Sequence, residues 1–171
     1  MKELSAEWTL LVYKIPANPS RLRLQVWRRL QRMGALYLQD AVCLLPARPD
    51  LVENMQYIAQ TIAEMEGIYH LFTAKSLFSD GTERLVQQFR HLADTRYADI
   101  SERIKIVEAT LEDAASLTAL ETAEEDLKRE RVAYLKAKRL SYFGSDWEVE
   151  VETHLDTLRC SLDDIHRGTN K

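Results

Sequence analysis

The order of strand-type and helix-type segments over about the first 77 residues is the feature that most restricts the possible folds. Trp8–Ile15 is rich in aromatic and branched residues, which is typical of a strand, and Pro16 ends it. Over Arg21–Met33 apolar residues recur every three or four positions, as on one face of a helix, and Gly34 follows as a helix-ending residue. A strand followed by a helix is therefore predicted first.

The next segments add two strands, a second helix and a fourth strand. Ala35–Gln39 and Ala41–Leu45 are short strand-type runs that predict a hairpin, and an apolar stripe over Pro49–Glu66 predicts a helix. The aromatic run Ile68–Thr73 predicts the last strand. This order is that of the split β-α-β, or ferredoxin-like, α+β fold, in which an antiparallel sheet carries both helices on one face. We predict such a domain over residues 1–78.

After Gly81 the strand-type pattern disappears and helical periodicity remains. One apolar stripe runs over Leu85–Leu111 and a second helical stretch over Leu117–Leu140, with the turn of a helical hairpin expected at residues 113–116. A further amphipathic helix closes the chain. The prediction for residues 79–171 is a helical extension, made of a long hairpin and a C-terminal helix.

Composition favours a folded cytoplasmic protein. Of the 171 residues, 46% are hydrophobic and 29% are charged, with only 5 Gly and 4 Pro, which is typical of a globular chain rather than a disordered one. The two cysteines, Cys43 and Cys160, lie far apart, and we find neither a signal-peptide pattern nor an apolar run of the ~20 residues that cross a bilayer. We therefore expect a cytoplasmic location and no membrane contact.

Charge is distributed unevenly along the chain. The net charge is −4, yet Lys14–Arg48 holds seven Lys or Arg residues and a single acid, Asp40. A local cationic patch binds phosphate whatever the total charge of the protein. The sequence therefore remains compatible with nucleic-acid binding.

The first predicted helix contains five arginines and no acid. The planar guanidinium group suits phosphate because it donates two parallel hydrogen bonds and stays charged. At about 100° per residue, Arg21, Arg28 and Arg32 fall near one face, and Arg29 lies nearer the apolar stripe. Two alternatives remain, a solvated helix face and a surface that binds acidic groups of a partner protein. The candidate DNA-binding residues are Lys14, Arg21, Arg23, Arg28, Arg29 and Arg32.

No local motif predicts catalysis, a metal or a cofactor. The four histidines lack close metal-ligand spacing, neither cysteine has a second one nearby, and there is no glycine-rich phosphate loop or nucleophile elbow. We expect a protein that is not an enzyme. Cys43 lies in an apolar strand-type run, where a buried and unreactive thiol is commoner than an oxidant sensor.

Four segments carry a resemblance to a known family. They are Trp8-Thr-Leu-Leu-Val-Tyr-Lys-Ile-Pro16, Arg23-Leu-Gln-Val-Trp-Arg-Arg-Leu-Gln-Arg-Met-Gly-Ala-Leu36, Asp40-Ala-Val-Cys-Leu-Leu-Pro46 and Leu140-Ser-Tyr-Phe-Gly144. They resemble the N-terminal domain of the chromate-resistance regulator ChrB over roughly Trp8–Leu162. The resemblance implies a transcriptional regulator whose N-terminal region binds double-stranded promoter DNA. The matching positions are Lys14, Arg23, Trp27, Arg28 and Arg29.

The resemblance also implies chromate or another oxyanion as an effector, although full-length members place the chromate response in a second domain, which we do not expect within these 171 residues. Helical stripes such as Val151–Ile165 lead us to expect a homodimer or small oligomer. One alternative is a protein-interaction module in a chromate-resistance or stress system. Another is a metal-dependent nuclease related to the small CRISPR-associated ferredoxin-like nucleases. Those nucleases use an acidic metal ligand near the end of the first strand, whereas this chain has Lys14 there, and a charged lysine does not coordinate metal.

Overall fold

The computed structural model describes residues 7–17, 20–112 and 117–169, and the chain divides into two compact units, residues 1–88 and 89–171. The first unit contains strands and helices in alternation, and α3 (Ser79–Glu112) begins in it and continues into the second. The elements that precede α3 are β1 (Trp8–Lys14), α1 (Ser20–Arg32), β2 (Leu36–Gln39), β3 (Val42–Pro46), α2 (Pro49–Glu64) and β4 (Ile68–Ala74).

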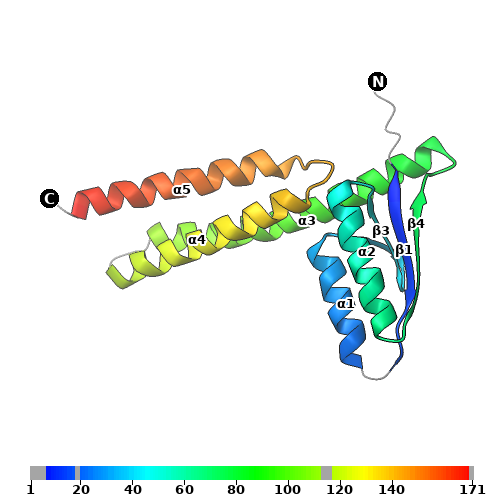
Figure 1. Cartoon of the computed structure of the whole chain (residues 1–171). Helices are drawn as coiled ribbons and strands as arrows, with labels where there is room; N and C mark the ends of the chain where they lie inside the picture. Colours follow the sequence, from blue (N-terminus) through cyan, green and yellow to red (C-terminus); the bar gives the residue numbers. More distant parts are fainter. Residues whose placement is uncertain (1–6, 18–19, 113–116, 170–171) are drawn as a thin grey trace. The chain divides into compact units, whose positions relative to one another are not determined.

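The four strands form one antiparallel sheet in the order β2-β3-β1-β4. Leu11 of β1 lies opposite Cys43 of β3 and Leu71 of β4. Both α1 and α2 lie on one face of the sheet (Figure 1). The predicted α+β class and its strand, helix, strand, strand, helix, strand order are confirmed.

Alternation along the strands sends side chains to two different faces. Thr9, Leu11 and Tyr13 of β1 lie on the helix-covered face, and the core there is fully buried. Each buried aliphatic side chain of this core contributes roughly 1.5–3 kcal/mol to the free energy of unfolding, because it leaves water when the chain folds. Besides Leu11, the buried residues of this core include Val26, Leu30, Cys43, Leu45, Met55, Ile58 and Ile62.

The opposite face of the sheet is covered over only part of its area. Trp8 and Leu44 are buried there, and Leu85 from the first turns of α3 lines the same hollow as Trp8. Toward the other end of the strands, large apolar side chains stay exposed. These are Leu38, Ile68 and Phe72, with 47%, 60% and 53% of their surfaces accessible.

Two glycines have conformational reasons for their positions. Gly34 has φ of 69°, in the left-handed region that ends helices, and the next residue, Ala35, donates its N–H to the Leu30 carbonyl oxygen at 3.1 Å. At Gly67 a Cβ atom would lie 2.8 Å from the Lys14 carbonyl oxygen and 2.6 Å from a methyl carbon of Ile62. Any larger residue at Gly67 would therefore push α2 and β1 apart.

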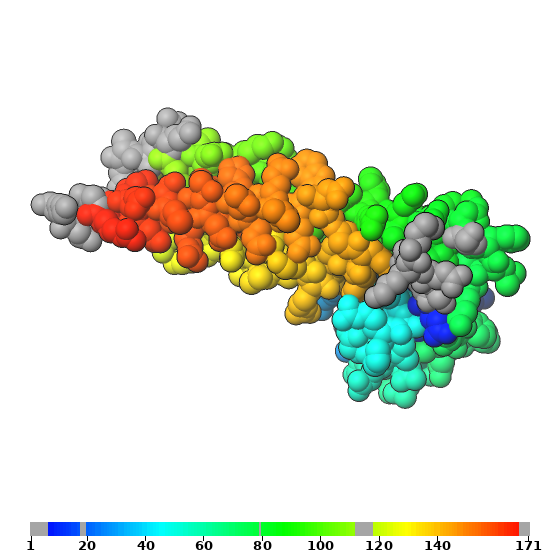
Figure 2. Space-filling view, turned by 90° about the horizontal axis from the view of Figure 1, so that it is seen from above, coloured from blue at the N-terminus to red at the C-terminus, as the bar shows by residue number. Residues whose placement is uncertain are grey.

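The second unit contains the rest of α3 together with α4 (Leu117–Leu140) and α5 (Trp147–Thr169). In Figure 2 the atoms of α5 lie along those of α4. A shared core includes Tyr97, Ile104 and Ala123, which have no accessible surface. The turn expected at residues 113–116 lies outside the described residues.

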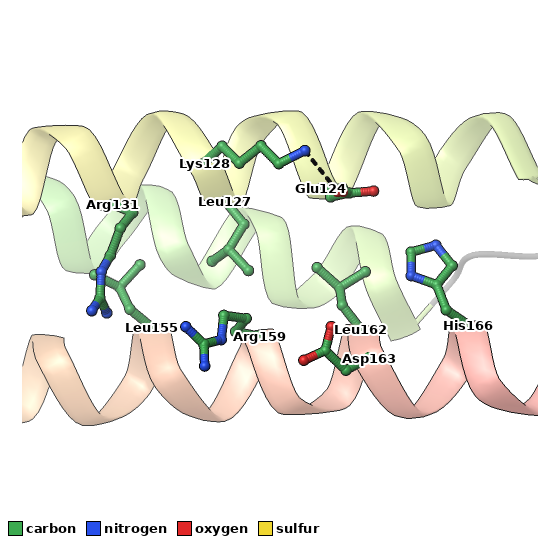
Figure 3. Close-up of a pocket in the computed structure, with 9 residues that line it drawn as sticks. All are labelled: Glu124, Leu127, Lys128, Arg131, Leu155, Arg159, Leu162, Asp163 and His166. Atoms are coloured by element: carbon green, nitrogen blue, oxygen red, sulfur yellow. Dashed lines mark ion pairs between the residues drawn. The ribbon is translucent and has the colours of Figure 1, made fainter.

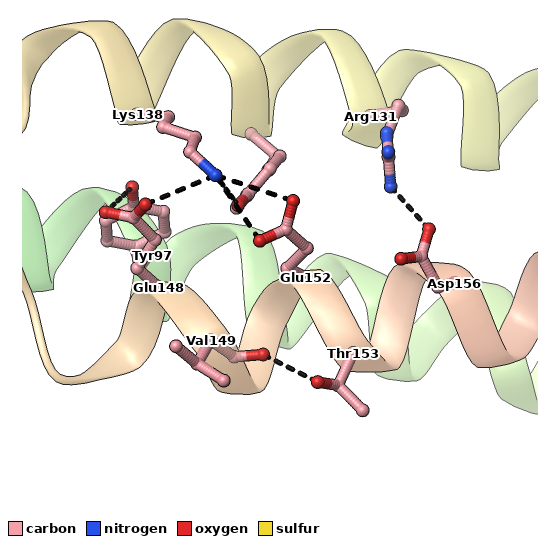
Figure 4. Close-up of polar contacts among 9 residues, drawn as sticks. Tyr97, Arg131, Lys138, Glu148, Val149, Glu152, Thr153 and Asp156 are labelled. Carbon is pink, nitrogen blue, oxygen red and sulfur yellow. Dashed lines mark hydrogen bonds and ion pairs between the residues drawn. The ribbon is translucent and has the colours of Figure 1, made fainter.

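A polar cluster joins the three helices of this unit (Figure 4). The Lys138 ammonium group donates to the Tyr134 hydroxyl at 3.1 Å and lies 3.4 Å from Glu148 and 3.3 Å from Glu152. The Tyr97 hydroxyl donates to Glu148 at 3.2 Å. Both tyrosine rings are fully buried, so these bonds satisfy hydroxyl groups that would otherwise be costly to bury.

Among the described residues, no helix combines the length and the apolar character that crossing a membrane requires.

Candidate nucleic-acid interface

The outer surface of α1 carries a row of like charges. Val26 and Leu30 bury one side of the helix against the sheet, which turns the positions about half a turn away toward solvent. Arg21, Arg28 and Arg32 are exposed and fall within a sector of about 40° of each other. We call these three residues the arginine stripe.

The charges of the arginine stripe are available to a ligand. α1 contains no acidic residue, and none of the three guanidinium groups has an ion pair or hydrogen bond with any described residue. Three cations without counter-charges repel each other weakly in water and attract anions. This arrangement can bind successive phosphate groups of a nucleic-acid backbone.

The other two arginines of α1 have partners inside the unit. The guanidinium carbon of Arg29 lies 4.4 Å from the centre of the Tyr57 ring on α2, a cation–π distance. Arg23 donates to the carbonyl oxygen of Ala17 at 3.3 Å, although its side chain stays exposed. Arg29 therefore contributes to packing of α1 on α2, and Arg23 to the segment that leads into α1.

Lys14 lies apart from the arginine stripe. Tyr13 faces α1, since it lines a hollow together with Trp27 and Gln31, and the next residue of a strand points to the opposite face. Lys14 is exposed and lies opposite Ile68 on that second face. The structure thus brings together three of the six residues that the sequence proposed.

A hollow of about 410 Å³ borders the stripe, between α1 and the β2–β3 turn. The Trp27 ring is 47% exposed at its rim, and the Tyr13 and Tyr37 hydroxyls are hydrogen-bonded to each other at 3.1 Å. Burial raises the pKa of both phenols, so both remain neutral donors at physiological pH. The two tyrosines are not among the site residues predicted from the sequence. Strand alternation does place Tyr13 on the face opposite Lys14, but no sequence pattern links Tyr13 to Tyr37, because the two belong to different strands.

A second hollow of about 250 Å³ lies between α4 and α5 (Figure 3). Basic residues line it, but Lys128 lies 2.7 Å from Glu124 and Arg131 lies 2.7 Å from Asp156. These pairs neutralise much of the local positive charge. The α4–α5 hollow is therefore a weaker phosphate site than α1.

Cys43 is fully buried, and burial raises the pKa of its thiol to about 12. The thiolate is the reactive form of cysteine, and a raised pKa keeps Cys43 protonated at neutral pH. Cys43 is therefore unreactive. Within the described ranges, no group of three or more His, Cys, Asp or Glu residues is placed to hold a metal ion.

The comparison with protein families identifies the chain. The family model for the N-terminal region of protein ChrB matches residues 23–167, which include most of α1 and nearly the whole second unit. The chain belongs to the ChrB N-terminal family. The resemblance drawn from the sequence is thereby confirmed.

Protein ChrB of Cupriavidus metallidurans is 28% identical to this chain over 158 residues. The match covers 91% of this chain and 46% of that protein. The chain thus spans about half the length of the curated relative it matches.

Proposed function

We propose that this member of the ChrB N-terminal family is a cytoplasmic DNA-binding regulator, not an enzyme, and that the arginine stripe of α1 binds the phosphate backbone of promoter DNA. The observation that supports it most directly is the row of three exposed arginines without internal counter-charges. Family membership supports a role in control of chromate-resistance genes, as the resemblance to ChrB implies. Chromate or another oxyanion is the proposed effector of the full-length system.

The residues beside the stripe fit the same proposal. Gln25 is exposed between Arg21 and Arg28 and offers an uncharged amide to a base edge or a phosphate. Trp27 and the Tyr13–Tyr37 pair are uncharged groups in the hollow beside the stripe, and the lining of this hollow also includes Asp40. Phosphate contacts would supply affinity, and these neutral groups would supply whatever sequence preference α1 has.

The test is titration of the protein onto a labelled fragment of its own upstream promoter at two salt concentrations. Loss of two phosphate contacts in Arg28→Gln plus Arg32→Gln should weaken binding about 10- to 100-fold at 0.1 M salt and reduce the salt dependence. The matched control is Arg48→Gln plus Arg84→Gln, which removes the same charge from two residues that already have acidic partners, Asp50 and Asp80.

Equal loss of binding in both double variants would show that net charge alone matters and would reject the stripe as the site. If the wild type binds no DNA at low salt, the DNA proposal fails. The stripe should then be tested by pull-down for an acidic partner protein.

A further inference from the structure

The two edges of the sheet in the first unit are built differently. β2 is four residues long, and its pairing with β3 is interrupted by a bulge between Tyr37 and Gln39. Short edge strands and bulges are features that prevent further strands from pairing. The β2 edge is therefore protected.

The β4 edge has no such protection. All seven of its residues pair with β1 in one unbroken register, from Ile68 opposite Lys14 to Ala74 opposite Trp8. The strand contains no Pro, Lys, Arg, Asp or Glu, and its outer backbone groups pair with no other strand among the described residues. A long edge without a bulge, a proline or a Lys, Arg, Asp or Glu residue is a template for another strand.

Large apolar or aromatic side chains of β4 are exposed on both faces of the sheet. Ile68 and Phe72 project from one face, and Tyr69, which is 37% exposed, from the other. Just beyond the strand, Leu77 and Phe78 are 93% and 72% exposed. Exposed apolar side chains on a strand and just beyond its end are typical of an interaction site.

The outer N–H and carbonyl groups of β4 bond either to water or to the backbone of another strand. The described part of the second unit has helices and a short connection between α4 and α5 but no strand, so it does not offer one. A second copy of the chain does, because β4 is self-complementary about Leu71. Antiparallel pairing centred on Leu71 puts His70 opposite Phe72 of the second copy, Tyr69 opposite Thr73, and Ile68 opposite Ala74.

We infer that two copies of this chain join edge to edge through β4, forming one continuous eight-stranded antiparallel sheet. Each facing pair includes an aromatic or aliphatic side chain, and none brings two Lys, Arg, Asp or Glu residues together. The two-fold axis of such a pair is perpendicular to the sheet, so the α1 and α2 layers of both copies lie on the same side. This inference does not depend on DNA binding.

The test uses opposite charges at one cross-strand pair. In Tyr69→Lys plus Thr73→Lys, each new lysine faces a lysine of the second copy, and in Tyr69→Glu plus Thr73→Glu, each glutamate faces a glutamate. Sedimentation equilibrium without DNA should give dimers for the wild type and a mass halved to that of the monomer for each variant. An equimolar mixture of the two variants should return to the dimer mass, because lysine then faces glutamate.

The mixture also controls for folding, since misfolded variants would not reassociate. Matched surface controls are Gln56→Lys plus Gln60→Lys and the corresponding glutamate pair, which place the same charges on exposed positions of α2 and should remain dimers. A monomeric wild type, variants that remain dimeric, or a mixture that stays monomeric would each overturn the inference. Dimers that survive in both variants would point instead to the helical unit.

Discussion

At the scale of single residues, the β2–β3 turn contains an avoidable strain. Ala41 has φ of 58°, in the left-handed region where a Cβ atom costs about 1 kcal/mol. Replacing Ala41 with Gly removes that cost but adds flexibility to the unfolded chain. Because relief of strain is the larger effect, Ala41→Gly should raise the free energy of unfolding by about 0.5 kcal/mol.

Urea unfolding followed by circular dichroism measures this change. Ala98→Gly in the middle of α3 provides the comparison, because there the same substitution should destabilise the protein by about 1 kcal/mol. If Ala41→Gly destabilised the chain as much as the helical substitution, the turn would not have the conformation described.

The two cysteines should differ sharply in reactivity. With a pKa of about 12, roughly one Cys43 thiol in ten thousand is ionised at pH 8, and its sulfur is shielded from solvent as well. Cys160 is exposed. Iodoacetamide should therefore modify one cysteine per folded chain, and both in denaturant, as counted by mass spectrometry. Cys160→Ser should abolish labelling of the folded chain, and rapid labelling of that variant would show that Cys43 is accessible.

At the scale of secondary-structure elements, the polar cluster of Tyr97, Tyr134, Lys138, Glu148 and Glu152, here called the Lys138 cluster, should make the stability of the helical unit decrease at acid pH. The hydrogen bond from Tyr134, together with nearby Lys138, holds the pKa of Glu152 below its ordinary value of 4.5. A carboxylate with a lowered folded pKa stabilises the native state above pH 4.5, and this contribution disappears as pH falls through the folded pKa. Lys138→Met should thus lower the Tm at pH 7 and have much less effect at pH 3.

Thermal melts between pH 3 and pH 7 provide the measurement. Lys136→Met is the matched control, because Lys136 lies on the same helix, is exposed and has no partner among the described residues. Its effect on Tm should be small and nearly independent of pH. Identical pH profiles for the two variants would contradict a specific role for the Lys138 cluster.

Helix and strand order could be predicted from the sequence because each element has a clear period and a clear end. The apolar repeat before Gly34 and the aromatic run of β4 both correspond to observed elements. The sequence could not reveal that the two edges of the sheet differ. That contrast depends on strand order and on a bulge in the β2–β3 pairing, which arise from contacts between distant segments.

The candidate site could be predicted only in part. Helical geometry was enough to group Arg21, Arg28 and Arg32, which lie together in the structure. Helical geometry could not predict the contact between Arg29 and the Tyr57 ring, because Tyr57 belongs to another helix. Strand alternation would have separated Lys14 from Tyr13, but which face α1 covers was unknown before the fold.

At the scale of the whole molecule, pairing through β4 would place two arginine stripes on one side of a continuous sheet. α1 lies beside the β2–β3 hairpin, at the end of the sheet away from β4. In the inferred dimer, the two α1 helices are separated by five to six strand spacings of ~4.8 Å. This is a distance of roughly 25–30 Å if the twist of the sheet is ignored. This is comparable with the ~34 Å between successive major grooves on one side of duplex DNA. The inferred dimer therefore suits a two-fold operator.

The salt dependence of DNA binding should report how many copies bind together. If each copy neutralises three phosphates through Arg21, Arg28 and Arg32, a dimer neutralises six, and the slope of log K against log salt is about −5. The monomeric Tyr69→Glu plus Thr73→Glu variant should give about −3, because only the three phosphate contacts of a single copy remain. Anisotropy titrations over 50–200 mM salt, with the mixed variants as a restored dimer, would measure these slopes. A wild-type slope near −3 would mean that each copy binds alone.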